Sequence, residues 1–289
     1  MLQNLHLTVA VENSASKSNS HLLAQHGLSI LMSLDLGGGE GMKLLWDTGA
    51  SSEVMLHNAA ALNIDLDAID LICLSHGHYD HTGGLMGVLA QRKSRGRERL
   101  GVLCHPDVFA AKLKARPGLK FIGLPFTETQ VEAEGGIWMQ CRGPVPIAPG
   151  LTTTGEIPRR EAFEAVEGFW TIREDRYCPD SIPDDQALAA DIPGKGLVVI
   201  TGCAHSGIIN TIKHALEITG AEKLHAVIGG FHLMGADDCR IEATVQALKK
   251  FHPAAVCPGH CTGEKAVSRL REAFGDRCKP MAVGDQTQF

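Results

Sequence analysis

The sequence lacks any apolar run of the ~20 residues that a membrane-spanning helix needs. Its first residues carry neither a basic stretch nor a long apolar stretch, so we expect no signal peptide and a cytoplasmic protein. A basic footprint is also missing: the formal net charge is −6, and the densest basic run, residues 92–97, is short enough to be a solvated loop. We therefore expect neither a membrane nor a nucleic acid as a partner.

The cysteines form no recognisable zinc motif. The nine are scattered along the chain, without the paired CxxC motifs of a zinc ribbon. Cys257 and Cys261 have CxxxC spacing but no second pair, so we expect no separate zinc site there. An odd number of cysteines, several of them in apolar segments, indicates reduced thiols.

Strand-like and helix-like patterns alternate in both halves of the chain. A chain of 289 residues can bury a substantial core. This alternation, with hairpin strands at the start, favours an α/β fold in which two packed sheets are flanked by helices. We expect strands at 5–11, 28–36, 42–46, 69–74, 100–104, 137–141, 169–174, 196–201, 224–228 and 254–257. We expect helices at 52–62, 84–91, 207–218, 236–250 and 263–274, the first capped by Ser51.

The middle of the chain, roughly 114–196, is rich in proline and glycine and is expected to be the least regular part. Long loops inside a compact protein often act as lids or pocket walls. We interpret residues 1–289 as a single domain with an irregular pocket-wall insertion at roughly 114–196. The polar residues 12–20 and His105, at the end of a strand, are both expected at the surface.

Four potential metal ligands lie in one loop: His76, His78, Asp80 and His81. They follow an apolar segment that is typical of a buried strand. Because alternate residues of an extended segment point the same way, His76 and His78 can share one ion, while Asp80 and His81 reach a neighbouring one. Imidazole and carboxylate ligands suit zinc, iron or manganese. The loop predicts a metal centre of one or two divalent ions, and hence an enzyme.

This HxHxDH loop resembles the hallmark of the metallo-β-lactamase superfamily. Residues 46–49, Trp-Asp-Thr-Gly, resemble the DTG turn of the same superfamily, and the resemblance covers essentially the whole chain. It implies a four-layered αβ/βα sandwich. It also implies that Asp47 supports the metal ligands from behind or serves as an alternative ligand.

The remaining ligands are expected in loops at the ends of later strands, on the opposite side of the centre, which we call its far wall. Cys203 matches the position where the superfamily has a bridging acidic ligand, and His205 follows two residues later. Either can ligate; we favour His205, because a histidine in a tight, glycine-flanked turn has few structural reasons to be there, and we keep Cys203 as the alternative. The helix end at 206–208 is a candidate phosphate site.

His260 lies in a turn that resembles the last ligand motif of the superfamily, Pro-Gly-His, and would close the second metal position. His232, at another strand end, is a candidate ligand, general acid or substrate contact, with a hydrogen-bonded structural role as the alternative. The superfamily usually has one more histidine in a GHT-like turn. The matching stretch, residues 149–159, has none. Either His205 or His232 takes its place, or one of the two metal positions binds its ion weakly.

A set of shorter motifs resembles one subgroup, which includes 7,8-dihydropterin-6-methyl-4-(β-D-ribofuranosyl)aminobenzene-5′-phosphate synthases. The resemblance implies a transferase that joins a dihydropterin diphosphate to an arylamine ribose phosphate, and so a small phosphorylated substrate. Asp80 and His232 are candidate catalytic residues. The motifs are QHGLS at 25–29, TGEIPR at 154–159, DDQAL at 184–188, TGCAHSGIIN at 201–210, GGFHL at 229–233 and PGHCTG at 258–263.

Three residues in or near these motifs, His26, Glu156 and Arg159, are candidate substrate contacts; a turn residue and an exposed ion pair are the alternatives. A second function uses the same ligands: a hydrolase of a phosphodiester, lactone or thioester, in which the ion activates water. A sensor with a degenerate site is the third and weakest hypothesis. The expected cofactor is a divalent metal, zinc first, with manganese, iron and magnesium open; a homo-oligomer also stays open.

Overall fold

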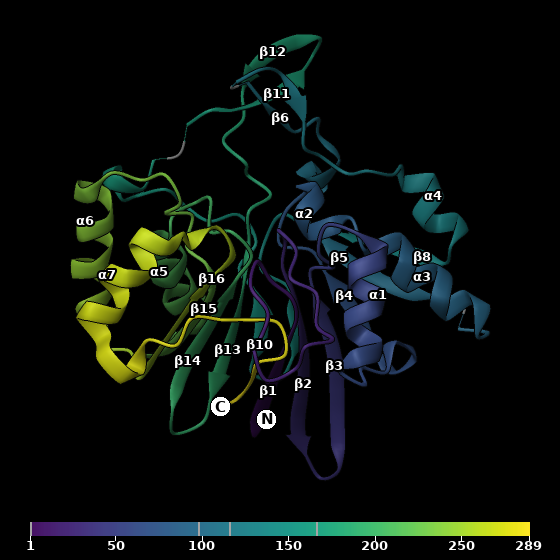
Figure 1. The fold of residues 1–289 in the computed structure, drawn as a ribbon, viewed down its shortest axis with the longest axis horizontal. Coiled ribbons are helices and arrows are strands. Elements are labelled where there is room, and N and C mark those ends of the chain that lie inside the picture. The colour runs from purple at the N-terminus through teal and green to yellow at the C-terminus, as the bar shows by residue number, and fades with distance from the viewer. Residues whose placement is uncertain (1, 98, 116, 166) are drawn as a thin grey trace.

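Two β-sheets lie face to face in the middle of the molecule, with helices on their outer faces (Figure 1). The computed structural model describes residues 2–97, 99–115, 117–165 and 167–289. Its first sheet has the strand order β17-β1-β2-β3-β4-β5-β8. These strands are β1 (Asn4–Val11), β2 (Ser29–Gly37), β3 (Glu40–Trp46), β4 (Leu71–Cys73), β5 (Leu100–Cys104), β8 (Gly136–Gln140) and β17 (Gln286–Gln288).

The second sheet has the order β16-β15-β14-β13-β10-β9, and a small sheet has the order β12-β11-β6-β7. The second sheet consists of β9 (Pro146–Ala148), β10 (Leu151–Thr153), β13 (Ala187–Ile192), β14 (Gly196–Thr201), β15 (Leu224–Gly230) and β16 (Ala255–Gly259). The small sheet consists of β6 (Leu113–Lys114), β7 (Lys120–Phe121), β11 (Phe169–Arg173) and β12 (Arg176–Pro179). The small sheet lies at the top of Figure 1, beyond the ends of the two large sheets.

Three hydrophobic clusters separate four layers. One lies between the sheets and joins residues such as Met32 of β2 and Ile200 of β14. A second joins the first sheet to Met55 and Val88 on its outer helices, and a third joins the second sheet to helices such as the one that carries Ile212. The helices are α1 (Ser52–Ala61), α2 (Tyr79–Thr82), α3 (Leu85–Ser94), α4 (Glu128–Ala133), α5 (Ile208–Thr219), α6 (Asp238–Lys249) and α7 (Glu264–Phe274). The predicted four-layered sandwich is confirmed.

Local signals place several helix ends. The side chain of Ser51 accepts a hydrogen bond from the N–H of Val54, as expected for the cap of α1. Helix α5 ends at Gly220, whose φ of 69° lies in the left-handed region that closes a helix at little cost for glycine. In the described part of the chain, no helix combines the length and the apolar character that crossing a bilayer requires.

The loops that carry the candidate ligands follow parallel strands. Strands β3, β4 and β5 are parallel neighbours, as are β14, β15 and β16. The loops that follow β4, β14, β15 and β16 carry the candidate ligands.

The segment 114–196 is more regular than its composition predicts, because β8 extends the first sheet and β9, β10 and β13 extend the second. We propose that residues 1–289 form one domain, since the cluster between the sheets draws on both halves.

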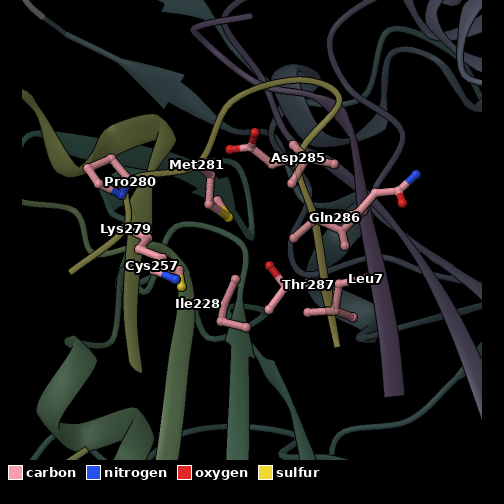
Figure 2. Close-up of a pocket in the computed structure, with 11 residues that line it drawn as sticks. Leu7, Ile228, Cys257, Lys279, Pro280, Met281, Asp285, Gln286 and Thr287 are labelled. Carbon is pink, nitrogen blue, oxygen red and sulfur yellow. The ribbon is translucent and has the colours of Figure 1, made fainter. Parts of the chain in front are cut away.

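A cavity of about 250 Å³ opens between the two sheets beside the C-terminal segment (Figure 2). Side chains of β1, β15 and β16 line it together with residues that precede β17; Leu7, Ile228, Cys257 and Met281 are examples. None of the candidate ligands is among its lining residues. The candidate metal centre therefore lies outside this cavity.

Candidate metal centre

The loop after β4 folds back on itself and brings its ligands together. A short helix, α2, begins at Tyr79, so that Asp80 and His81 turn back towards His76 and His78. All four predicted ligands are buried. They are joined by the predicted far-wall residues His205, His232, His260 and Cys203, which also belong to candidate metal-binding groups of the described chain. Cys261, which the sequence analysis did not predict as a ligand, belongs to one of these groups as well.

One group consists of His76, His78 and His205, whose nearest ring nitrogens all lie within 4.8 Å of one another. The Nε2 of His76 lies 2.9 Å from the Nδ1 of His78. Within the described structure, the Nε2 of His78 and both ring nitrogens of His205 have no hydrogen-bond partner. Burial lowers the pKa of His78 to about 3 and holds the pKa values of His76 and His205 well below the usual value. Burial therefore favours the neutral form of all three imidazoles, which is the form that binds a metal.

A second group consists of Asp80, His81 and His260. The Nε2 atoms of His81 and His260 lie 3.1 Å apart, and Asp80 Oδ2 lies 3.8 Å from the first and 3.4 Å from the second. Burial alone would raise the pKa of Asp80, but the neighbouring His81 and hydrogen bonds from histidines hold it well below the usual value. An ionised carboxylate and two facing ring nitrogens form a donor set that suits a divalent cation.

Asp47 fixes the orientation of His81. Its Oδ2 lies 2.7 Å from the Nδ1 of His81, while the N–H and hydroxyl of Ser75 donate to its two oxygens. Because Asp47 accepts the Nδ1 proton, the Nε2 of His81 faces the centre. Burial opposes a charge on His81, but Asp47 and Asp80 raise its pKa to about 9. The DTG turn therefore lies where the sequence resemblance implied that it supports the metal loop.

Two residues that the sequence analysis missed orient His260. The Oδ1 of Asn13 lies 3.0 Å from the Nδ1 of His260, and the carboxylate of Glu12 accepts the His260 N–H. Glu12 is only 2% exposed, so the prediction that 12–20 is a surface loop is wrong for this residue. The one local signal was an acidic residue placed directly after a strand of apolar character.

The other site candidates lie around these two groups. His232 packs against His205, with ring centroids 4.1 Å apart, and its Nδ1 has no partner among the described residues. His26 is exposed and its Nε2 lies 3.1 Å from Asp80 Oδ2; this hydrogen bond raises its pKa. Phe169, which the sequence analysis missed, stacks on His78 with ring centroids 5.4 Å apart. Phe169 opens β11, so the small sheet reaches the metal centre.

Glu156 and Arg159 are engaged within the protein. Glu156 accepts hydrogen bonds from His105 and Arg142, each at 2.9 Å. His105 is buried, so its expected surface position is wrong. Arg159 donates to the carbonyl oxygen of His205 and to two further carbonyls. Substrate binding by Glu156 and Arg159 stays a prediction, and Arg159 also supports the His205 loop.

Carboxylates occupy backbone donors at the end of α5, so the predicted phosphate site at 206–208 loses the Ser206 N–H and otherwise stays a prediction. The buried Glu164 accepts the N–H groups of Ile209 and Asn210, each at 2.8 Å. Burial raises the pKa of Glu164 to about 7, against the effect of those two hydrogen bonds. The N–H of Ser206 donates to Asp185 in the same way. The backbone N–H groups of Ser206, Ile209 and Asn210 are therefore not free to bind an external anion.

The DDQAL motif holds both metal loops. Asp184 Oδ2 accepts the Gly77 N–H at 2.7 Å, and Asp185 Oδ2 accepts the Ser206 N–H at 2.8 Å. Asp184 also pairs with Lys112, which is fully buried and lies 3.2 Å from a second carboxylate. One short segment before β13 therefore fixes the backbone next to His76 and next to His205.

Comparison with known proteins decides the family. The sequence profile of the metallo-beta-lactamase superfamily matches residues 29–161. The 7,8-dihydropterin-6-methyl-4-(beta-D-ribofuranosyl)-aminobenzene-5'-phosphate synthase of Methanocaldococcus jannaschii is 35% identical over 277 residues, 94% of this chain and 92% of the relative. The chain belongs to the metallo-β-lactamase superfamily. An uncharacterized protein of the same archaeon is 31% identical over 266 residues, 92% of this chain and 94% of the relative.

Solved structures of the superfamily agree with this fold. Tm1679, described as a metal-dependent hydrolase of the beta-lactamase superfamily, has a TM-score of 0.80 and 28% identity, with 98% of both chains covered. Zinc-bound PqqB from Methylobacterium extorquens, at a TM-score of 0.52 and 13% identity, covers 98% of this chain and 99% of its own, and shows the fold alone. A synthase and a metal-dependent hydrolase among the similar proteins support an enzyme that acts on a small molecule.

Proposed function

We propose that this chain is a metal-dependent transferase that joins a dihydropterin-methyl diphosphate to an arylamine ribose phosphate, as the subgroup resemblance implies. The observation that carries the proposal is the 35% identity to the archaeal synthase over 94% of this chain. The hydrolase-like relative Tm1679 is less similar in sequence, at 28% identity.

The residues present fit a metal. Buried ring nitrogens without partners, on His78 and His205, are costly unless a cation or a donor meets them. We assign one ion to His76, His78 and His205, whose ligand atoms form one candidate group. We assign a second ion to Asp80, His81 and His260 from the distances of 3.1–3.8 Å that join their ligand atoms. When bound, a divalent ion neutralises the charge that develops on a leaving diphosphate.

The chain's own side chains orient the reactants and move protons. Asp47 and Asn13 hold the rings of His81 and His260 by their Nδ1 atoms. His232 has an unpartnered Nδ1 beside His205, and we assign it the proton that the arylamine nitrogen loses on transfer. His26 is more than half exposed next to Asp80 and is placed to contact the substrate at the mouth.

A metal-dependent hydrolase is the second candidate. It is favoured by the TM-score of 0.80 to Tm1679, a fold match over 98% of both chains. The same ligand groups serve both reactions, because both need a polarising ion next to a phosphate or carbonyl oxygen. The two functions differ in what accepts the transferred group: an arylamine in one and water in the other.

The decisive experiment follows diphosphate release from a dihydropterin-methyl diphosphate by metal-loaded protein, with and without an arylamine ribose phosphate. A transferase releases diphosphate only with the arylamine and forms the coupled product. Release at the same rate without arylamine, or turnover of bis-p-nitrophenyl phosphate alone, would establish the hydrolase instead.

His78→Ala is the matched variant for this experiment. It removes a ligand whose ring lies in the first group, so we expect loss of metal-dependent turnover by at least ~100-fold and a lower metal content. His57→Ala is the control, since His57 lies on the exposed face of α1 and bonds a carbonyl oxygen of the loop before β2. Unchanged metal content and turnover in His78→Ala would refute the site assignment.

A further inference from the structure

The thiols of Cys203 and Cys261 lie close together on the far side of the metal centre. The sequence analysis did not predict this pair, because it considered only the CxxxC spacing of Cys257 and Cys261. The sulfur atoms of Cys203 and Cys261 and a ring nitrogen of His260 all lie within 4.8 Å of one another. Cys261 Sγ donates to the carbonyl oxygen of Cys203 at 3.4 Å. Cys257, which has the CxxxC spacing with Cys261, lines the cavity between the sheets instead. The partner of Cys261 therefore comes from a different strand end.

Cys203 is the residue that the neighbouring ligand groups share. Its sulfur lies 3.3 Å from the Nε2 of His81. It is grouped with His76 and His81, with His205 and His232, and with His260 and Cys261. A sulfur atom in this position is within reach of both imidazole groups of the centre.

The backbone keeps room for the sulfur atoms and aims His232 at them. Gly230 is the last residue of β15 and precedes the loop that carries His232. A Cβ atom on Gly230 would lie 2.6 Å from the Cys261 sulfur. His232 has a φ of 46°, a left-handed conformation that is rare for residues other than glycine. Its Nδ1 is buried and has no partner in the described structure, and one ligand atom of His232 lies within 4.8 Å of Cys203.

We propose that Cys203 and Cys261 are sulfur ligands of the metal centre, with His232 beside them, and that the centre therefore takes a borderline ion such as zinc and rejects magnesium. Thiolate ligands select zinc and other soft or borderline ions, whereas magnesium requires oxygen ligands. This inference rests on the metal centre of the proposed function. It is independent of whether the reaction is a transfer or a hydrolysis.

Cobalt tests the proposal, because Co²⁺ replaces zinc and shows a sulfur-to-metal charge-transfer absorption in the near ultraviolet when thiolates bind it. Metal-free wild type, Cys203→Ser, Cys261→Ser and the control Cys257→Ser are loaded with cobalt. We expect the absorption per bound cobalt in wild type and Cys257→Ser, about half of it in each of the other two, and none in the double variant. A tenfold excess of magnesium is expected to leave the absorption unchanged.

The proposal is overturned if wild type binds cobalt without this absorption, or if Cys261→Ser keeps it in full. If a serine variant does not fold, zinc-edge X-ray absorption of the wild type decides: a sulfur shell at ~2.3 Å supports the proposal, and nitrogen and oxygen shells alone refute it. Sulfur ligation with neither transfer nor hydrolysis would leave this inference standing and refute the proposed function.

Discussion

At the scale of single residues, hydrogen bonds to the outer nitrogens of the histidines decide what the centre presents. Asp47 and Asn13 take the Nδ1 sides of His81 and His260, so the two Nε2 atoms face each other at 3.1 Å. Two facing ring nitrogens with lone pairs repel unless a proton or a cation lies between them. The supporting residues therefore matter as much as the ligands themselves.

Asp47→Asn tests this argument. Asparagine can still accept from Ser75, but its amide would then donate to His81 Nδ1 and move the ring proton to Nε2, where the metal has to bind. We expect zinc affinity to fall by ~10–100-fold, measured by competition with a chromophoric chelator. Asp238→Asn, on an exposed side chain, is the control. Equal zinc affinity in Asp47→Asn and wild type would contradict the role given to Asp47.

At the scale of elements, buried carboxylates hold helix ends and loops. Glu164 accepts two N–H groups of α5, and its pKa of about 7 means that the folded state binds its proton more tightly than the unfolded state does. Its protonated form therefore favours folding at low pH, and that contribution is lost as the pH rises from the unfolded value of ~4.3 through 7.

Glu164→Gln is expected to flatten this dependence. In urea unfolding between pH 5 and pH 8, the variant should lack a loss of stability on the order of 2–3 kcal/mol that the wild type shows as the pH rises. The slope is the readout, because glutamine also loses one of the two accepted hydrogen bonds. Glu217→Gln, on an exposed side chain of the same helix, should keep the wild-type slope. Parallel curves for Glu164→Gln and wild type would show that this group does not titrate near neutrality.

Lys112→Met tests the segment before β13. The fully buried ammonium group pairs with Asp180 and Asp184, and Asp184 also holds the Gly77 N–H of the metal loop. Removing one partner of a buried ion pair costs about 3–5 kcal/mol, because the carboxylates stay buried without it. We expect a loss of this size in urea unfolding, against less than ~1 kcal/mol for Lys93→Met at the surface. A loss below ~1 kcal/mol for Lys112→Met would show that the carboxylates find other partners.

The same elements show what sequence patterns can and cannot predict. The strands at Leu100–Cys104 and Gly196–Thr201 were predicted to the residue, because continuous apolar runs between turn signals indicate buried strands. Strands of two residues, such as Leu113–Lys114, were missed because pairing with a distant strand defines them. The ligand loop was predicted from spacing, but contacts such as that of Asn13 with His260 join distant parts of the chain and leave no local pattern.

At the scale of the whole molecule, the metal centre lies at one edge of a core that does not depend on it. The three hydrophobic clusters of the described chain take their residues from the sheets and helices, and they include neither Cys203 nor Cys261, the two buried thiols at the centre. Metal binding should therefore add to the stability of a structure that already folds, unlike in small zinc domains that unfold without metal.

Chelation tests this separation of core and centre. We expect metal-free protein to keep its far-ultraviolet circular dichroism and to melt roughly 5–11 °C lower. A ligand at 100 times its Kd adds about 2.7 kcal/mol, and each kcal/mol moves Tm by roughly 2–4 °C in chains of about 150–250 residues. Zinc should restore the wild-type Tm and leave that of His78→Ala nearly unchanged. Without metal, His76, His78 and His205 stay buried in their uncharged form. Removing the metal should therefore lower Tm without unfolding the protein. Unfolding by chelator alone would show instead that the ions hold the two sheets together.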